Sequence, residues 1–456
     1  MEYIIKPKKV RVKDVYDVAV IGGGPAGIGA AIASARKGAK TVLIEKRGFL
    51  GGNITACYVE TCNHFLHRAN FDVGGIYAEI EDKYRQKFGN SDDIRPNSPH
   101  RFSSEYLKIF LDAFMRNEGI ALKLHSFVND IIMEDDIIQC VIIQSKKGPV
   151  AIKAAQFVDA TGDGDVAYSA KVPFAQGRDR DGRCQPGTLN FRITGADSKL
   201  LSEGHDHLAE IIKKFREDYR AGKTGLRCHR QDIPFGRLTP AGQISYVNYP
   251  CAYGIDPTDI DDLSRGEIEC REYILEMYHY MKNNFEGMEN IELASIAPEI
   301  GFRDSRRIKG EYVLTEEDIE TSKQFDDAIL EYPRFYDMLT PDEKLLTHGD
   351  GSWEGRGYEG HIYVPVEEGR TYSIPYRCLI PIGVKNLLVS GRCISANHVA
   401  ESSVRAISAC MLTGQVAGTA AAMCSKENLM PRDIDIRKLQ KTLKQDKVRL
   451  PKYLKV

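Results

Sequence analysis

The sequence lacks several patterns that would assign it to a specialised class. Its eleven cysteines include no C-x-x-C pair, and because zinc and iron–sulfur sites usually show close cysteine spacings, neither kind of metal site is expected. An odd cysteine count in a chain of 456 residues also argues against a disulfide framework. Reduced thiols in the cytoplasm are the simplest interpretation.

Long apolar runs and a strong charge bias are also missing. No stretch of about 18 apolar residues occurs, so the sequence predicts no membrane span. The first residues, MEYIIKPKKVRVKDVYD, are basic without a following apolar segment, which is unlike a secretory signal. The formal net charge is only −2, so neither nucleic acid nor an anionic membrane is expected as a partner.

Residues 16–46, YDVAVIGGGPAGIGAAIASARKGAKTVLIEK, carry the pattern of a strand, a helix and a second strand. DVAVIG and TVLIEK are continuous apolar runs, as in parallel strands buried on both faces. Between them, Ile28, Ala31, Ile32 and Ala35 recur at helical spacing before Gly38 ends the helix. The segment therefore predicts a βαβ unit.

The turn inside this unit has the spacing G-x-G-x-x-G, formed by Gly22, Gly24 and Gly27. Its glycines allow a tight turn, close approach of a pyrophosphate and close helix packing, and the helix N-terminus offers free N–H groups. Glu45 lies at the end of the second strand, where an acid holds ribose hydroxyls. Because strand, turn, helix and acid agree, we expect dinucleotide binding; a tight turn without a ligand is the alternative.

The remaining sequence divides into three parts. A helix is expected at 104–118, and residues 120–158 read as a β-meander that returns to the nucleotide-binding sheet at QFVDATG. Residues 180–375 mix strand-like runs with helical stretches at 205–220 and 261–284, which suggests an inserted second domain. The strand NLLVSG and a helix of small residues then return to the first domain.

Several segments together resemble the FAD-dependent oxidoreductase family, whose glutathione-reductase-like FAD fold is similar to the flavoprotein subunits of succinate dehydrogenase and fumarate reductase. The segments cover nearly the whole chain and are VIGGGPAGIGAA, GFLGGNIT, FVDATGDGDVA, EIGFRDSRRIKGEYVLTEEDI, YSIPYRCLIP and NLLVSGRCISANHVAESSVRAISACMLTGQVAGTAAA. The resemblance implies an α/β protein with a Rossmann-like FAD-binding domain, a β-meander and an inserted α+β substrate domain. The implied boundaries are 1–180 and 375–456 for the FAD-binding domain and 181–374 for the insert.

The resemblance also implies which residues hold the cofactor, FAD. Residues expected beside its pyrophosphate, adenosine and flavin ring are Gly22, Gly24, Ala26, Gly27, Glu45, Lys46, Arg47, Gly51, Gly52, Asn53, Thr55, Val128, Thr161, Gly162 and Asp163. Near the C-terminus, Gly391 precedes Arg392 where related FAD folds often carry an acid that contacts the ribitol. Arg392 is therefore expected to reach phosphate instead.

The stretch SGRCISANHVAESSVR, residues 390–405, places ionisable groups at the junction of the last strand and the last long helix. In this fold the helix N-terminus points at the flavin, where it and an arginine stabilise the negative charge of the reduced ring. The expected groups are Arg405 and the backbone of Ser403 and Val404. These three residues are expected at the flavin because of the resemblance and because they follow the last strand.

His398 is the expected proton-transfer residue, since imidazole titrates near neutral pH; a histidine bonded to loop backbone is the equal alternative. Glu401 either orients this histidine or caps the next helix. Three further arginines in GFRDSRRIKGEY, at positions 303, 306 and 307, suit a carboxylate or polyhydroxyl ligand, although a salt-bridged interface is the favoured interpretation.

These expectations predict an FAD-dependent oxidoreductase that exchanges a hydride with a small polar substrate, such as a hydroxylated compound, a sugar derivative or an organic acid. The alternative is a flavin-dependent reductase fed by NAD(P)H or by a partner electron carrier, although no second G-x-G-x-x-G is present for a nicotinamide nucleotide. An RNA-modifying flavoprotein is disfavoured by the near-neutral charge. An electron acceptor or carrier protein and an oligomer remain open as partners.

Overall fold

A mixed seven-stranded sheet organises the computed structural model, which describes residues 9–61, 71–89, 102–202, 207–230, 232–342 and 361–456. Its strand order is β3-β2-β1-β6-β5-β4, and β18 also pairs with β6. The strands are β1 (Arg11–Ile21), β2 (Thr41–Ile44), β3 (Ala121–Lys123), β4 (Phe127–Glu134), β5 (Ile137–Ser145), β6 (Gly148–Asp159) and β18 (Leu387–Val389).

The pairing within this sheet confirms the expected α/β architecture. β1 runs parallel to β2 and to β6, whereas β4, β5 and β6 form an antiparallel meander. β18 adds to β6 in parallel, with Leu387 opposite Phe157. The C-terminal strand thus returns to the first domain after a long excursion, as the sequence predicts.

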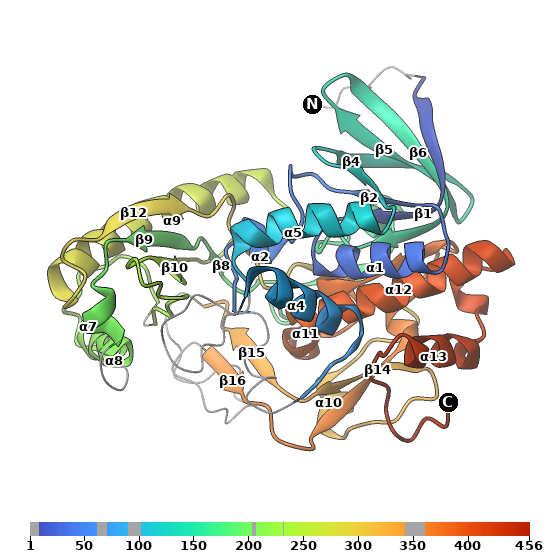
Figure 1. The fold of residues 1–456 in the computed structure, drawn as a ribbon. Coiled ribbons are helices and arrows are strands. Elements are labelled where there is room, and N and C mark those ends of the chain that lie inside the picture. Colours follow the sequence, from blue (N-terminus) through green and yellow to red (C-terminus); the bar gives the residue numbers. More distant parts are fainter. Residues whose placement is uncertain (1–8, 62–70, 90–101, 203–206, 231, 343–360) are drawn as a thin grey trace.

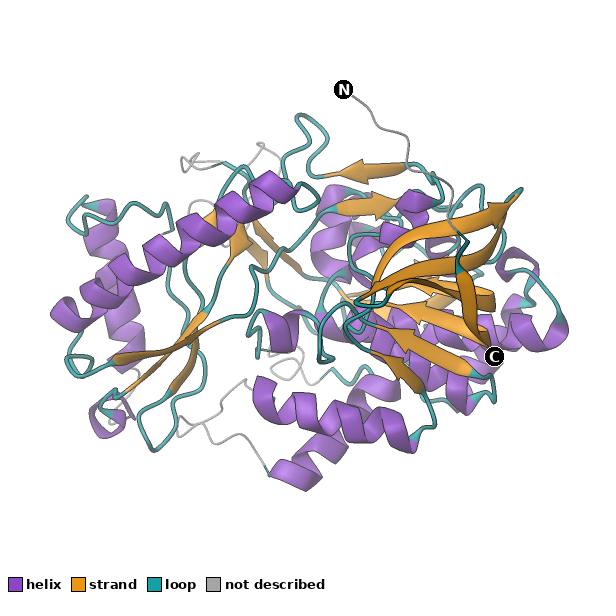
Figure 2. Cartoon of the chain, turned by 90° about the horizontal axis from the view of Figure 1, so that it is seen from above, coloured by secondary structure: helices purple, strands orange, loops and turns teal. Residues whose placement is uncertain are grey.

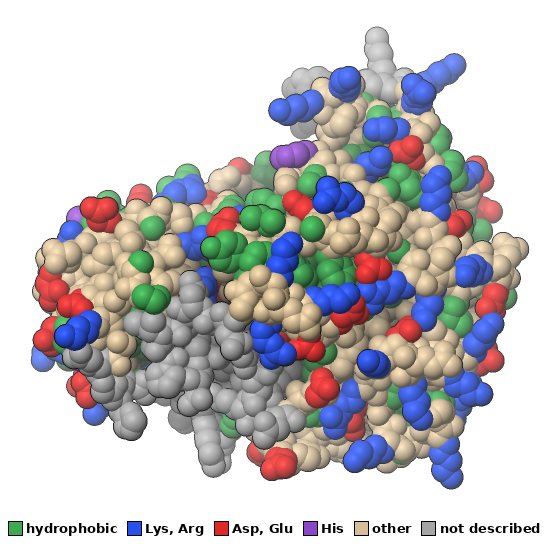
Figure 3. All heavy atoms as spheres, in the orientation of Figure 1, with side chains coloured by type: hydrophobic (Ala, Val, Ile, Leu, Met, Phe, Trp, Pro, Cys, Tyr) green, Lys and Arg blue, Asp and Glu red, His purple; other side chains and the backbone are tan. Residues whose placement is uncertain are grey.

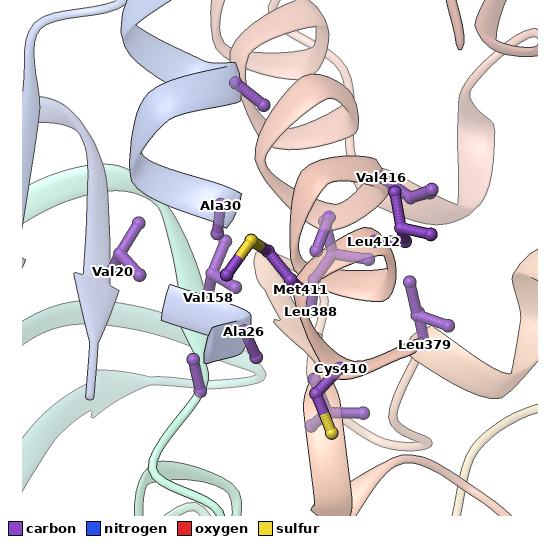
Figure 4. Packing of buried hydrophobic residues seen from close by; sticks show 14 of the residues in the cluster. Val20, Ala26, Ala30, Val158, Leu379, Leu388, Cys410, Met411, Leu412 and Val416 are labelled. Atoms are coloured by element: carbon purple, nitrogen blue, oxygen red, sulfur yellow. The ribbon is translucent and has the colours of Figure 1, made fainter. Parts of the chain in front are cut away.

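Two helices cross beside this sheet at unusually close range. They are α1 (Pro25–Arg36) and α12 (Ile407–Glu427), and Figure 4 shows Ala26 and Ala30 of α1 beside Met411 of α12. A Cβ atom on Gly414 would lie 1.9 Å from the carbonyl oxygen of Ala26, so only glycine allows this approach. The small residues of α12 therefore bring the two ends of the chain together at the phosphate-binding turn.

Among the described residues, α12 is the one helix whose length and apolar composition would allow it to cross a membrane. However, 94% of its apolar window is buried inside the structure, where it contacts α1 and other elements. This burial identifies α12 as a core helix. Its apolar side chains pack against α1 and against strands of the sheet.

The inserted region has a hydrophobic core of its own. Its elements lie together at one side of the molecule, away from the main sheet (Figure 2), and its core side chains come from residues 189–302, with Tyr58 added. The predicted insert spans 181–374, and within and just after it side chains from 308–380 pack in the first core. The elements are β8 (Gly187–Thr188), β9 (Phe191–Thr194), α7 (Ser198–Ser202), α8 (His207–Arg220), β10 (Ile244–Val247), β11 (Cys251–Ala252), α9 (Ile260–Asn284) and β12 (Glu292–Ile296).

The other elements surround these two cores (Figure 1). They are α2 (Asn53–Ala56), α4 (Gly75–Phe88), α5 (Ser104–Asn117), α6 (Asp165–Ser169), β7 (Phe174–Gln176), β13 (Arg306–Ile308), α10 (Glu316–Glu320), β14 (Ala328–Pro333), β15 (Tyr336–Leu339), β16 (His361–Val364), β17 (Thr371–Pro375), η1 (Tyr376–Leu379), η2 (Gly391–Cys393), α11 (His398–Val404), η3 (Pro431–Asp433) and α13 (Ile436–Gln445). Basic and acidic side chains are interspersed on the face shown in Figure 3.

Candidate active site

The turn between β1 and α1 has the geometry that its glycines predict. Gly22 has φ of 101°, a conformation that suits glycine. A Cβ atom on Gly27 would lie 1.7 Å from the carbonyl oxygen of Gly22, so the first turn of the helix packs directly on the loop. The N-terminus of α1, with Pro25 at its start, is thereby left facing a cavity with its N–H groups free for an anion.

Glu45 directly follows β2, and its carboxylate stabilises this turn. Its Oε2 accepts a hydrogen bond of 2.6 Å from the backbone N–H of Gly23, and its Oε1 accepts one of 2.8 Å from the backbone N–H of Arg47. The carboxylate also lines the cavity. Oε1 also accepts a hydrogen bond of 3.2 Å from Nη1 of Arg47, whereas Oε2 keeps a further lone pair, which is the chemistry needed to accept a ribose hydroxyl.

The cavity is open to solvent and extends from this turn past Glu45 to the residues that follow β6 and β18. It is narrow between two backbone segments, because a Cβ atom on Gly52 would lie 2.8 Å from the Cα atom of Gly24. Expected cofactor residues in its lining are Gly22, Gly24, Ala26, Glu45, Lys46, Arg47, Gly52, Asn53, Thr161, Gly162, Asp163, Gly391 and Arg392. The two backbone segments touch there, and the glycine-lined N-terminus of α1 beside this contact suits the pyrophosphate of FAD.

Other expected cofactor residues support the wall from behind. The backbone N–H of Gly51 donates to the carbonyl oxygen of Gly23 at 2.9 Å, and the Thr55 hydroxyl donates to Leu50 at 2.7 Å. Gly27 has the packing role described above. Val128 lies on β4, opposite Ile143, and is absent from the cavity lining.

The backbone groups expected at the flavin are absent from the cavity lining. Ser403 and Val404 are buried in the last turn of α11, where the Ser403 hydroxyl lies 2.9 Å from the Tyr372 hydroxyl. The helix start that faces the cavity belongs to α12, and Ile407 and Cys410 line the cavity there. A break at Arg405 and Ala406 separates α11 from α12, which begins at Ile407.

Arg392 is held by an acid of the cavity wall. Its Nη2 lies 2.6 Å from Oδ1 of Asp163, and its Nη1 donates to the Ser305 hydroxyl at 3.1 Å. Burial alone would raise the pKa of Asp163, but Arg392 and the Ser305 hydroxyl hold it below its usual value. Two of the N–H donors of Arg392 thus bond to Asp163 and Ser305, and its contact with the phosphate of the cofactor stays a prediction.

The inserted region supplies a second wall of the cavity, which the sequence does not predict. Its lining residues are Pro257, Leu263, Glu267, Glu299, Ile300 and Phe302. Glu299 forms an ion pair with Arg47, in which Nε and Oε2 are 2.9 Å apart. No local pattern marks these residues, because they meet the cavity only when the insert folds back over it.

His398 opens α11 beside a buried acid. Its Nδ1 lies 3.2 Å from Oδ2 of Asp304, and the other oxygen of Asp304 accepts a hydrogen bond of 2.8 Å from the backbone N–H of Gln185. Neither ring nitrogen has a hydrogen bond within the described part of the chain. His398 is buried and is absent from the lining of the main cavity. Asp304 was not expected, since it is distant from His398 in sequence.

Glu401 follows His398 by one turn of the same helix. It is fully buried, and neither carboxyl oxygen has a hydrogen-bond partner among the described residues. Burial raises the pKa of Glu401 to about 8, and nearby Asp304 adds to this rise. α12 begins after Ala406 without a side-chain cap, so Glu401 neither caps that helix nor bonds to His398.

Arg405 connects this buried group to the cavity, which it lines. Its Nη2 donates to the backbone carbonyl of Asp337 and lies 3.7 Å from the carboxylate of that residue. Its Nε is buried without a hydrogen bond in the described residues. His398, Glu401 and Arg405 are spaced along one face of α11. This face therefore runs from the cavity, at Arg405, to the buried His398, which lies beside Asp304.

Comparison with known proteins identifies the family of this chain. A family model described as FAD dependent oxidoreductase matches residues 17–443. The chain belongs to this family, is an FAD-dependent oxidoreductase and uses FAD as its cofactor.

Individual relatives match more narrowly. Mitochondrial dihydrolipoyl dehydrogenase of Schizosaccharomyces pombe is 37% identical over 86 residues, 16% of this chain and 17% of that protein. Ferredoxin–NADP reductase 3 of Lysinibacillus sphaericus is 51% identical over 70 residues, 15% of this chain and 18% of that protein. The chain thus matches less than a fifth of the length of these relatives.

Two solved structures are similar along most of the chain, at low identity. A geranylgeranyl bacteriochlorophyll reductase-like protein from Thermoplasma acidophilum has a TM-score of 0.46 and 14% identity, covering 95% of this chain and 84% of its own. The myxobacterial chondrochloren halogenase has a TM-score of 0.43 and 12% identity, covering 95% and 79%. Both likenesses are distant.

Proposed function

We propose that this oxidoreductase exchanges a hydride between FAD and a small polar organic substrate: a hydroxylated compound, a sugar derivative or an organic acid. One observation carries the proposal. His398, Asp304, Glu401 and Arg405 each have a buried polar atom without a hydrogen bond among the described residues, and they gather beside the cavity. Since more than about 90% of buried polar groups in proteins are paired, such a cluster supports a catalytic use.

Each residue has a chemical task in this proposal. Bound FAD supplies the hydride acceptor or donor. His398 lies behind the cavity wall and is the proposed acceptor of the proton that a substrate hydroxyl releases as its carbon loses a hydride, and Asp304 lies 3.2 Å from Nδ1 to orient the imidazole ring. Arg405 lines the cavity and places positive charge beside it.

The test is the visible spectrum of the FAD-loaded protein under anaerobic conditions, with sugars, polyols and hydroxy acids added in turn. We expect an organic hydroxyl compound to bleach the flavin absorbance without any nicotinamide. Bleaching by NADH or NADPH alone, with every organic compound inert, would overturn the proposal.

That second result would favour a reductase fed by NAD(P)H or by a partner electron carrier. The short matches to ferredoxin–NADP reductases and dihydrolipoyl dehydrogenases support this second candidate function. An electron carrier protein would then be the partner, and its reduction in a coupled assay would identify it.

A cytoplasmic location accompanies the proposal. All ten described cysteines are free and buried, which suits a reducing compartment. Fractionation of cells that express the protein at its natural level tests this location.

A further inference from the structure

Glu45 marks the end of the cavity that would hold the adenosine of FAD, because an acid after the second strand accepts ribose hydroxyls. Nη1 of Arg47 lies 3.2 Å from Oε1 of Glu45, and Nε of Arg47 lies 2.9 Å from Oε2 of Glu299 in the inserted region. All three residues line the cavity. The insert therefore meets the cavity at its adenosine end.

The long helix of the insert, α9, is held at the same place. The backbone N–H of Ile300, which follows Glu299, donates to Oε1 of Glu267 on α9 at 2.7 Å. Leu263 precedes Glu267 by four residues, so both lie on one face of α9, and both line the cavity. Pro257, shortly before the helix, lines the cavity as well. Two apolar residues of the insert are thereby placed on the wall beside Glu299.

Leu263 is an apolar residue that the insert buries only in part. It packs against the hydrophobic core of the insert, yet it stays partly exposed and lines the cavity. The carboxylates beside it have partners, since Glu267 bonds to Arg271 at 2.7 Å and Glu299 to Arg47 at 2.9 Å. The wall here thus combines apolar surface with paired charges, which suits an uncharged, flat ring.

The β-meander does not supply this surface. The backbone N–H groups of His125 and Ser126 donate to the carbonyl oxygens of Arg47 and Glu45, at 3.0 and 2.9 Å. This connection between β3 and β4 therefore packs on the chain after β2, and no described residue of β3, of β4 or of their connection lines the cavity. Val128, which the resemblance implies beside the cofactor, lies on β4. The insert is thus the element that lines the cavity next to the ribose position.

We propose that the inserted region binds the adenine ring of FAD, on an apolar surface formed by Leu263 and Pro257. The inference goes beyond the proposed function, because it concerns the cofactor and does not depend on the substrate. The faces of adenine are apolar, so packing the ring on aliphatic side chains removes both surfaces from water. The ribose then lies at Glu45 and the pyrophosphate at the N-terminus of α1. The insert is then part of the cofactor site.

The first experiment measures the dissociation constants of FAD and of ADP, which carries the adenosine and both phosphates, for the FAD-free protein by isothermal titration calorimetry. Leu263→Ala should weaken the binding of both by about fivefold, because apolar contact with the base is lost. The matched control is Leu275→Ala, the same change at an exposed leucine of α9 outside the cavity lining, and it should bind both as the wild type does. Equal FAD binding by Leu263→Ala and wild type would overturn the inference. Weaker FAD binding with unchanged ADP binding would place Leu263 at the flavin half and would overturn it too.

The second experiment uses the wild type, so it decides even if Leu263→Ala misfolds. An ADP derivative with an azide on the adenine ring is bound to the FAD-free protein and activated by light, and the labelled peptide is identified by mass spectrometry. We expect label within residues 257–267, and excess FAD should prevent it. Label on β4 instead, or no label that FAD prevents, would overturn the inference. Neither experiment needs flavin reduction, so a failed substrate panel leaves both results readable.

Discussion

His398 of α11 and Asp304 of the segment leaving the insert lie 3.2 Å apart, between Nδ1 and Oδ2, in the buried interior beside the flavin cavity. The contact joins the FAD-binding domain to the inserted region. A carboxylate at this distance is placed to orient the imidazole ring, as a group that accepts a proton from the substrate requires.

Replacing His398 by glutamine should slow flavin reduction by the substrate roughly 10²- to 10⁴-fold, the range typical of lost general base catalysis. Asp304→Asn should slow it less, because the ring stays in place with weaker orientation. Stopped-flow absorbance measures both rates. FAD content should remain as in the wild type, since neither residue lines the cavity.

A matched control for that experiment is His279→Gln, because His279 is an exposed histidine on α9. Its reduction rate should equal that of the wild type. Unchanged reduction in His398→Gln would remove this histidine from the mechanism.

Glu401 should make the stability of the protein depend on pH. Its pKa is about 8 in the folded protein and 4.5 in an unperturbed carboxyl, so between these values the folded state holds a proton that the unfolded state releases. The free energy of unfolding should therefore fall as the pH rises through this window, by on the order of 3–5 kcal/mol. Glu401→Gln should lose this slope and gain relative stability above pH 8.

Denaturant unfolding of the two proteins at pH 5, 6.5, 8 and 9 measures the difference. Glu292→Gln, on an exposed position of β12, is the control and should follow the wild type. Parallel pH profiles for wild type and Glu401→Gln would contradict a raised pKa at this carboxyl.

Alanine substitutions at two glycines of the phosphate-binding turn should have different effects, one on stability and one on FAD binding. Gly27→Ala places a methyl group 1.7 Å from the carbonyl oxygen of Gly22, so the backbone must move, and the FAD-free protein should lose about 3 kcal/mol or more of stability. Gly24→Ala places it 3.8 Å from the Cα atom of Gly52, in the cavity, so stability should persist while FAD binding weakens. Thermal unfolding without FAD and fluorescence titration with FAD separate the two effects.

The ion pair between Arg47 and Glu299 closes one side of the cavity. Arg47 also bonds to Glu45, which fastens the turn, whereas Glu299 pairs with Arg47 alone among the described residues. Arg47→Ala should therefore weaken FAD binding several-fold, and Glu299→Ala should change it by less than about 1 kcal/mol, as expected for a partly exposed pair. Equal losses in the two variants, measured by FAD titration, would contradict this division of roles.

The parts of the site that the sequence predicts are those encoded locally. The strand, turn and helix around Gly22 and Gly27 occupy one continuous segment, so periodicity and glycine spacing identify them. The strand end at Thr161 and the β-meander follow from alternation and turn residues in the same way.

The parts that the sequence does not predict depend on contacts between distant segments. Asp304 reaches His398 only because the chain returns from the insert beneath α11. The resemblance implies that the backbone of Ser403 and Val404 faces the flavin, but both residues lie in α11 and the helix start that lines the cavity is that of α12. The second cavity wall, with Phe302 and Glu267, arises from tertiary folding of the insert and has no local signature.

The most direct test of hydride exchange with an organic substrate is the anaerobic rate of flavin bleaching by a compound that carries either hydrogen or deuterium on the carbon to be oxidised. We predict bleaching without any nicotinamide, and clearly slower bleaching with deuterium, because that carbon–hydrogen bond breaks as the flavin is reduced. Bleaching by NADH or NADPH alone, with the organic compounds inert in either isotopic form, would contradict hydride exchange with a small polar substrate and would support the reductase.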